Sequence, residues 1–210
     1  MKKILIADDH ELIRSGLNKF IEMQLSHCLV DEANNGDAAF QKIKYNDYDL
    51  VILDVNMPGT DSFGLLSNII AVKPTAKVLM FSMNAEEIYA KKYLQLGARG
   101  YLSKAASNKE IGTAITSILD NKKYISDNLR DVFADEAKGN KKPNPLDELS
   151  NREFEIVQYL IRGQSVGEIS KLFNLHTSTT GTHKARILKK LNCKNVVDIN
   201  LLATLHKVAI

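Results

Sequence analysis

VILDVNMPG, residues 51–59, decides how the N-terminal part of this chain folds. Aliphatic residues with a strong preference for strands surround one aspartate, Asp54, and a Pro-Gly pair ends the run. This pattern predicts a buried parallel strand. A carboxylate at the carboxyl end of such a strand lies where open α/β sheets place their ligands. Asp54 is therefore the first candidate functional residue, although an isolated aspartate here would more often cap the following turn.

On both sides of this stretch, short apolar runs alternate with longer amphipathic ones from residue 2 to residue 125. The alternation predicts five strand-helix units, the arrangement of a doubly wound, five-stranded parallel sheet with helices on both faces. The predicted strands are 2–8, 28–34, 49–54, 77–82 and 99–104, and the predicted helices occupy 11–24, 107–120 and stretches that begin at 36, 61 and 84.

Polar residues at the ends of these strands predict a site for a divalent cation. Asp8, Asp9, Asp54, Ser82 and Lys104 all end apolar runs, and the carboxyl ends of central parallel strands lie side by side. Three carboxylates in one crevice repel each other unless a cation neutralises them. Oxygen ligands suit Mg²⁺, which is usually held by one or two carboxylates together with phosphate oxygens. An aspartate beside Mg²⁺ can accept a phosphoryl group while a lysine offsets the charge.

Length and composition bound the class of protein. A chain of 210 residues, 44% hydrophobic and 25% charged, is expected to form two ordinary globular domains. Its apolar runs are too short for a membrane helix, and no small-residue cleavage site follows the N-terminal lysines. Cys28 and Cys193 are too few for a disulfide framework. We therefore expect a soluble, cytoplasmic protein with no membrane partner.

The C-terminal part carries the positive charge and a purely helical pattern. The formal net charge is +3, and residues 176–194 contain five cations and no acid, which predicts a polyanionic partner, although solvated basic helix faces are common. After KGNKKPNPLDEL (138–149), the clearest linker, helices are predicted at 150–163, where Ser150 and Glu153 form a capping box, and at 165–173, 177–191 and 195–208. A basic helix that follows another after a tight turn indicates a helix-turn-helix.

The N-terminal motifs ADDH (7–10), LDVNMPG (53–59), FS (81–82) and YLSK (101–104) resemble the receiver domain of two-component response regulators. The resemblance covers residues 1–120 and implies a flavodoxin-like α/β fold. It implies that Asp54 is the phosphoacceptor, assisted by Lys104 and Ser82, and that Mg²⁺ is the cofactor. The implied metal ligands are Asp9 directly, Asp8 through water, Asp54, and the backbone carbonyl of Asn56. Ser82 and Tyr101 are the implied switch pair, although an aromatic residue on a buried strand is most often part of the core.

Three positions depart from the receiver pattern. Met83 stands where a small residue is usual, so access to Asp54 is expected to be restricted. Ala105 replaces a common proline after Lys104 and leaves the isomer of that peptide bond open, because a cis bond without proline costs roughly 3 kcal/mol. Ser62 replaces a frequent glycine, and little consequence is expected.

LSNREFEIVQYLIRGQSVGEISKLFNLHTSTTGTHKARILKKL (149–191) resembles the LuxR-type helix-turn-helix domain of the NarL/FixJ response regulators. The resemblance places side chains near the start of the basic helix against bases and its cations against phosphates. The positions used for base contact hold Gly181, Thr182 and Ala185, so direct readout should be thin. The expected DNA-binding residues are Ser178, Thr179, Thr182, Lys184, Arg186, Lys189 and Lys190.

Together, the resemblances predict a DNA-binding transcriptional response regulator rather than an enzyme. The expected domains are the receiver at 1–122, a linker with a short helix at 123–148 and a LuxR-type DNA-binding domain at 149–210. A histidine kinase would phosphorylate Asp54, and phosphorylation would control homodimerisation and binding to double-stranded promoter DNA. One alternative is a constitutive DNA binder whose receiver serves only for protein contact. The other is a Mg²⁺-dependent aspartyl phosphohydrolase, which is disfavoured because Asn56 stands where such an enzyme needs a second acid.

Overall fold

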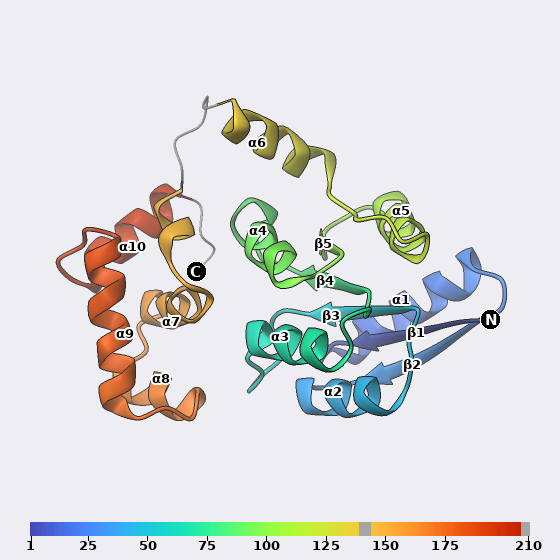
Figure 1. Ribbon diagram of the computed structural model, residues 1–210, viewed down its shortest axis with the longest axis horizontal. Helices are drawn as coiled ribbons and strands as arrows, with labels where there is room; N and C mark the ends of the chain where they lie inside the picture. The colour runs from blue at the N-terminus through green and yellow to red at the C-terminus, as the bar shows by residue number, and fades with distance from the viewer. Residues whose placement is uncertain (139–143, 207–210) are drawn as a thin grey trace. The chain divides into compact units, whose positions relative to one another are not determined.

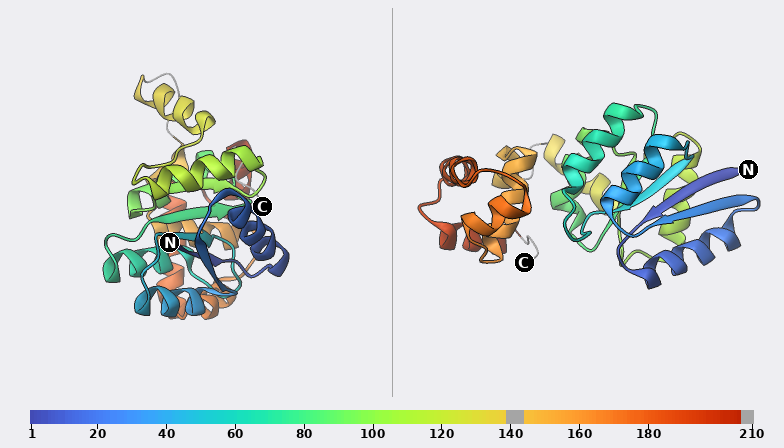
Figure 2. Two further views of the ribbon diagram at one scale, coloured as in Figure 1. Left: turned by 90° about the vertical axis from the view of Figure 1, so that its right-hand side faces the viewer. Right: turned by 90° about the horizontal axis from the view of Figure 1, so that it is seen from below.

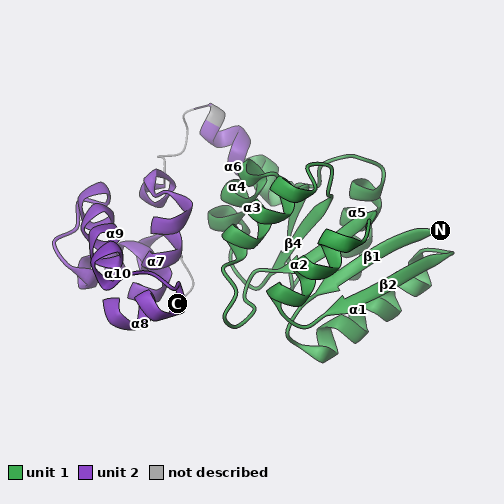
Figure 3. Ribbon diagram, turned by 60° about the horizontal axis from the view of Figure 1, so that its bottom comes forward, with its two compact units in different colours: residues 1–131 green, residues 132–210 purple. Residues whose placement is uncertain are grey.

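The computed structural model describes residues 1–138 and 144–206. The chain divides into two compact units, 1–131 and 132–210, which are described separately (Figure 3). Residues 139–143, which belong to the predicted linker, lie outside the described residues. Residues 207–210, which include the end of the last predicted helix, also lie outside them.

A five-stranded, all-parallel sheet forms the centre of the first unit, in the order β2-β1-β3-β4-β5 (Figure 1). This order and the crossover helices confirm the predicted flavodoxin-like fold. The strands are β1 (Lys2–Ala7), β2 (Cys28–Ala33), β3 (Leu50–Asp54), β4 (Val78–Ser82) and β5 (Gly100–Ser103).

Helices cover both faces of the sheet because alternate strand residues point to opposite faces and both sets are apolar. The helices are α1 (Glu11–Gln24), α2 (Gly36–Tyr45), α3 (Ser62–Val72), α4 (Glu86–Leu96) and α5 (Asn108–Leu119). In the right-hand view of Figure 2, α1 lies on one side of the strands and α2 and α3 on the other. One core cluster joins Ile4, Ile6 and Leu79 of the sheet to Ile21 of α1 and Ile115 of α5.

The opposite side of the sheet contains an aromatic stack that joins two helices to β5. The rings of Phe63 on α3 and Tyr93 on α4 are parallel, with centroids 4.1 Å apart. Tyr93 also stacks on Tyr101 of β5 at 5.9 Å. Tyr101 is 1% exposed, so it belongs to this core whatever its further role.

Helix α6 (Asp127–Ala137) follows the sheet, and its start packs as an extension of the first unit. Tyr124 and Leu129 are buried, and Asn128 Nδ2 donates to Glu87 Oε1 at 2.6 Å. Ser126 Oγ donates to Glu86 Oε2, and Glu86 Oε1 accepts from the backbone N–H of Ser103 at 3.0 Å. The beginning of the predicted linker is therefore attached to α4 and β5.

The second unit is helical, and the capping signals in its sequence set the helix starts. A 3₁₀ turn, η1 (Pro145–Glu148), precedes α7 (Asn151–Ile161), α8 (Val166–Leu172), α9 (Thr177–Lys190) and α10 (Val196–Leu205). The predicted capping box of Ser150 and Glu153 is present, and Ser165 and Glu168 form another at α8. Asn174 adopts φ 50° in the α8–α9 turn, a left-handed conformation that Asn tolerates. Among the described residues, no helix is both long and apolar enough to span a membrane.

Candidate functional site

The acidic residues and the lysine predicted from strand ends meet in one cluster at the carboxyl edge of the sheet. Asp8 and Asp54 are each 1% exposed, and Asp54 is the last residue of β3. The amine Nζ of Lys104 lies 2.6 Å from Asp8 Oδ2 and 2.9 Å from Asp54 Oδ2. The other oxygen of Asp54, Oδ1, accepts the backbone N–H of Asn56 at 3.1 Å. The sequence therefore identified residues that do lie together.

Charges in this cluster are only partly balanced. Burial raises the pKa of Asp54, although the hydrogen bonds from Lys104 and the Asn56 N–H act in the opposite direction. Burial alone would lower the pKa of Lys104, but its contacts with Asp8 and Asp54 reverse that effect and raise it. One ammonium thus faces two buried carboxylates, and an additional cation would relieve the remaining repulsion.

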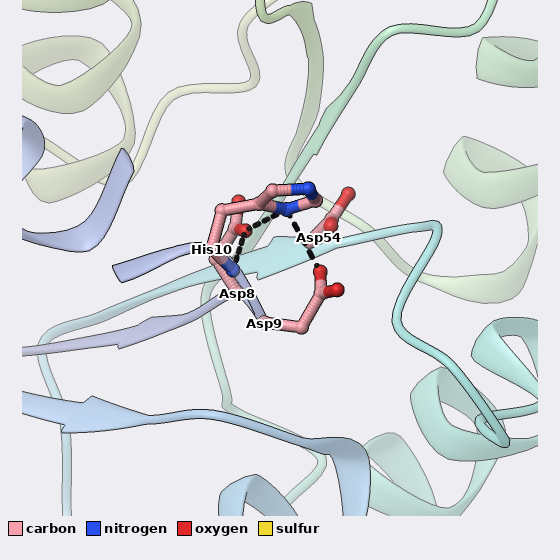
Figure 4. A group of neighbouring side chains, drawn as sticks. All are labelled: Asp8, Asp9, His10 and Asp54. Atoms are coloured by element: carbon pink, nitrogen blue, oxygen red, sulfur yellow. Dashed lines mark hydrogen bonds and ion pairs between the residues drawn. The ribbon is translucent and has the colours of Figure 1, made fainter. Parts of the chain in front are cut away.

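His10 lies beside the acids, as Figure 4 shows. Its Nδ1 is 3.1 Å from Asp8 Oδ1 and 3.0 Å from Asp9 Oδ1, and its side chain is 64% exposed. Ligand atoms of Asp8, Asp9, His10 and Asp54 all lie within 4.8 Å of one another. Because carboxylate oxygens dominate this set, the residues fit a hard divalent ion such as Mg²⁺.

The two predicted switch residues hold the same neighbour, Asn84, which sequence reasoning missed. Ser82 is fully buried, and its Oγ accepts the backbone N–H of Asn84 at 3.1 Å. Tyr101 donates its hydroxyl to the backbone carbonyl of Asn84 at 3.2 Å. Burial raises the pKa of Tyr101, which keeps the phenol protonated as a donor. The side chain of Asn84 also donates to Asn56 Oδ1 at 3.2 Å, so it joins the loops that follow β3 and β4.

The positions that depart from the receiver pattern have separate outcomes. Met83 is 68% exposed, so most of its side chain lies in solvent. The peptide bond before Ala105 is trans, as are all those within the described residues. Ser62 is buried, and its Oγ lies 2.8 Å from the hydroxyl of Tyr93, a contact that the sequence did not indicate.

Arg14 and Glu86 are two further supporting residues that the sequence did not reveal. Arg14 Nη1 donates to the backbone carbonyl of Asp8 at 2.8 Å and its Nε to Glu32 at 2.9 Å, which fixes the loop after β1. Glu86 accepts the backbone N–H of Ser103, the residue before Lys104. The arginine lies in the first turn of the helix after the acidic pair and the glutamate starts α4, but neither position alone indicates these contacts.

In the second unit, α9 presents the residues expected to contact DNA. Ser178, Thr179, Thr182, Arg186 and Lys189 are exposed, and Lys184 is half-buried. Thr180, at an apolar position, is fully buried. Burial lowers the pKa of His183 on the same helix, which favours the neutral form of this side chain.

Lys190, also expected to contact DNA, is engaged within the second unit. Its Nζ donates to Glu153 Oε2 at 2.6 Å and to the backbone carbonyl of Glu148 at 3.1 Å. A contact between Lys190 and DNA stays a prediction, but this geometry gives the amine a different partner. The sequence could not separate Lys190 from its neighbour Lys189, because only the packing of α9 on α7 distinguishes them.

An acidic cluster on a doubly wound sheet, in one chain with a helix-turn-helix that has an exposed basic face, defines a two-domain regulator. A family model for the response regulator receiver domain matches residues 4–116, and one for bacterial regulatory proteins of the luxR family matches residues 147–203. The chain therefore belongs to the two-component response regulators of the NarL/FixJ family.

Relatives share this organisation over nearly their whole length. The chain is 32% identical to response regulator UvrY of Escherichia coli (strain K12) over 207 residues, which cover 98% of this chain and 95% of UvrY. It is 31% identical to the oxygen regulatory protein NreC of Staphylococcus carnosus over 205 residues, with 94% of each chain covered.

Solved structures show the same fold. A structure of RcsB from Salmonella typhimurium superposes with a TM-score of 0.79 at 23% identity and covers 100% of both chains. RcsB from Salmonella enterica serovar Typhimurium, bound to promoter rprA in the presence of the phosphomimetic BeF3-, superposes with a TM-score of 0.76 at 22% identity, covering 97% of this chain and 98% of RcsB.

Proposed function

We propose that this chain is a cytoplasmic transcriptional regulator that a histidine kinase switches by phosphorylating Asp54. The observation that carries the proposal is the position of Lys104, whose amine contacts both Asp54 and Asp8, with all three side chains buried. Phosphoryl transfer requires positive charge close to the attacking carboxylate, because charge spreads over the transferring oxygens. The phosphorus-nitrogen bond of the kinase phosphohistidine would break, and a phosphorus-oxygen bond to Asp54 would form.

Asp8, Asp9, Asp54 and the Asn56 carbonyl would hold Mg²⁺, which when bound supplies positive charge to the phosphoryl oxygens. Lys104 would shift from pairing with two aspartates to pairing with the phosphoryl group. Ser82 Oγ would donate to a phosphoryl oxygen and release the N–H of Asn84 that it now accepts. Because Tyr101 holds the carbonyl of the same residue, movement of Asn84 would reach the core of β5.

Phosphorylation would then favour a homodimer whose two α9 helices bind double-stranded promoter DNA. The exposed hydroxyls and cations of α9 support this step. A solved structure of two RcsB dimers bound to two parallel DNAs supports this step by analogy. Light scattering of the chain before and after treatment with a phosphodonor tests this step, and an unchanged mass would contradict it.

Incubation with acetyl phosphate and Mg²⁺, followed by intact mass measurement, tests the phosphoacceptor. We expect one stable phosphate on the wild-type chain and on Asp37→Asn, which removes an exposed acid of α2, and none on Asp54→Asn. Chelation of Mg²⁺ should suppress the reaction. Phosphate incorporation by Asp54→Asn at the wild-type level would overturn the assignment, continuous turnover would indicate a phosphohydrolase, and no reaction would indicate a constitutive DNA binder.

A further inference from the structure

Charged side chains of the first turn of α7 contact the carboxyl end of α9 and the end of α8, the helix before α9 (Figure 1 labels the three helices). At the carboxyl end of α9, Lys190 binds Glu153 Oε2 and the carbonyl of Glu148, which ends the 3₁₀ turn. Glu153 is 3% exposed, and its Oε2 also accepts the backbone N–H of Ser150 at 2.8 Å in the capping box. A buried carboxylate in this position needs its cation, because losing one partner leaves the other charge buried and unpaired.

Arg152, the residue before Glu153, contacts the end of α8 shortly before α9 begins. Its guanidinium carbon lies 3.9 Å from the ring centroid of Phe173, and its Nη2 donates to the Phe173 carbonyl at 3.4 Å. Phe173 is the C-cap of α8, immediately before the turn that leads into α9. Its ring also packs edge-on against Tyr159 of α7, with centroids 5.2 Å apart. Arg152 and Glu153 are consecutive residues, so one turn of α7 contacts both the end of α8 that leads into α9 and the carboxyl end of α9.

We propose that Lys190 and Arg152 are positioning residues that fix the angle of α9 for reading DNA, and that Lys190 is not a phosphate contact. This proposal rests on the proposed DNA-binding function. A helix of 14 residues is about 21 Å long, so loosening one end displaces side chains at the other. Loss of positioning should reduce discrimination between sequences, whereas loss of a phosphate contact should weaken all DNA equally and lower the salt dependence.

Two adjacent lysines provide a matched test. Both lysines are exposed, but Lys190 is in the ion pair with Glu153, so Lys189→Gln and Lys190→Gln remove the same charge one residue apart. The affinity of the full chain, treated with acetyl phosphate and Mg²⁺, is measured for two duplexes of equal length over a range of salt concentrations. One duplex is enriched from a random pool by the wild-type chain, and the other has a random sequence. We expect Lys189→Gln to lower the salt slope by about one unit with unchanged discrimination.

Lys190→Gln should instead keep the wild-type slope, lower the ratio of specific to random affinity, and lower the melting temperature of the second unit. A fall in slope by about one unit, with unchanged discrimination and melting temperature, would overturn the proposal.

Glu153→Gln gives an independent readout. Removing an acid from a DNA-binding unit ordinarily strengthens binding, because it reduces repulsion of phosphates. If Glu153 positions α9, the reverse is expected, which is a loss of affinity for the specific duplex. The neutral amide cannot form the ion pair with Lys190. Stronger binding of Glu153→Gln to both duplexes would count against the proposal.

If the Glu153→Gln variant does not fold, the comparison of the Lys189 and Lys190 variants still tests the proposal. If the wild-type chain enriches no duplex, the DNA-binding function itself fails, which is distinct from failure of the positioning role.

Discussion

Ser62 shows how a single hydroxyl contributes to the first unit. Its Oγ and the hydroxyl of Tyr93 form a buried hydrogen bond at 2.8 Å, beside the stack of Tyr93 on Phe63. Ser62→Ala would leave the tyrosine hydroxyl without this partner, which should lower the free energy of unfolding by about 1–2 kcal/mol. Ser67→Ala, at an exposed position of the same helix, should change it by less than about 0.5 kcal/mol. Thermal melts of both variants make the measurement, and equal effects would argue against the bond.

The residues of the acidic site that the strand pattern predicted share one property, which is that they lie at the carboxyl ends of apolar strand runs. Asp54 and Lys104 could be placed together because parallel strands align their carboxyl ends, so a local pattern implied a distant contact. Asn84 and Glu86 could not be predicted in this way, since their roles depend on backbone groups and the exact path of the loop after β4. Lys190 differs from Lys189 only in what it packs against, which no periodicity in the sequence records.

At the scale of secondary-structure elements, α4 is connected to α6 through Glu86, which also contacts the end of β5 beside the acidic cluster. Glu86 at the start of α4 accepts from the Ser103 N–H and from the hydroxyl of Ser126, which precedes α6. Glu86→Ala should therefore loosen the first turn of α6, where Leu129 is buried. We expect faster amide hydrogen exchange at residues 127–130 in this variant, while Glu22→Ala on the exposed face of α1 leaves it unchanged. Unaltered protection in Glu86→Ala would mean that hydrophobic packing alone holds α6.

The recognition helix α9 should rely more on charge and shape than on base contacts. Gly181 and Ala185 have no hydrogen-bonding side chain, and the hydroxyl of Thr182 donates to the Ser178 carbonyl at 3.0 Å. Bidentate contacts to guanine or adenine are therefore unavailable at these positions. Arg186→Ala should weaken binding to specific and random duplexes alike and lower the salt slope by about one unit. Thr182→Ala should relax specificity with an almost unchanged slope, through loss of its methyl contact. If Arg186→Ala erased discrimination and left the slope intact, this arginine would read a base.

For the whole molecule, the division into two compact units has a functional consequence. The net positive charge lies in the second unit, which contains its own capped helices and buried core. A fragment of residues 146–210 should therefore fold and bind duplex DNA without the receiver, with affinity that falls as salt rises. Phosphorylation of the full chain would then act by relieving occlusion of α9 or by pairing two such units, rather than by building the DNA-binding surface.

Fluorescence anisotropy with a labelled duplex compares DNA binding by the fragment, the untreated chain and the phosphorylated chain. Binding by the phosphorylated chain, together with no binding by a folded fragment even at low salt, would show that the receiver contributes part of the DNA-binding surface.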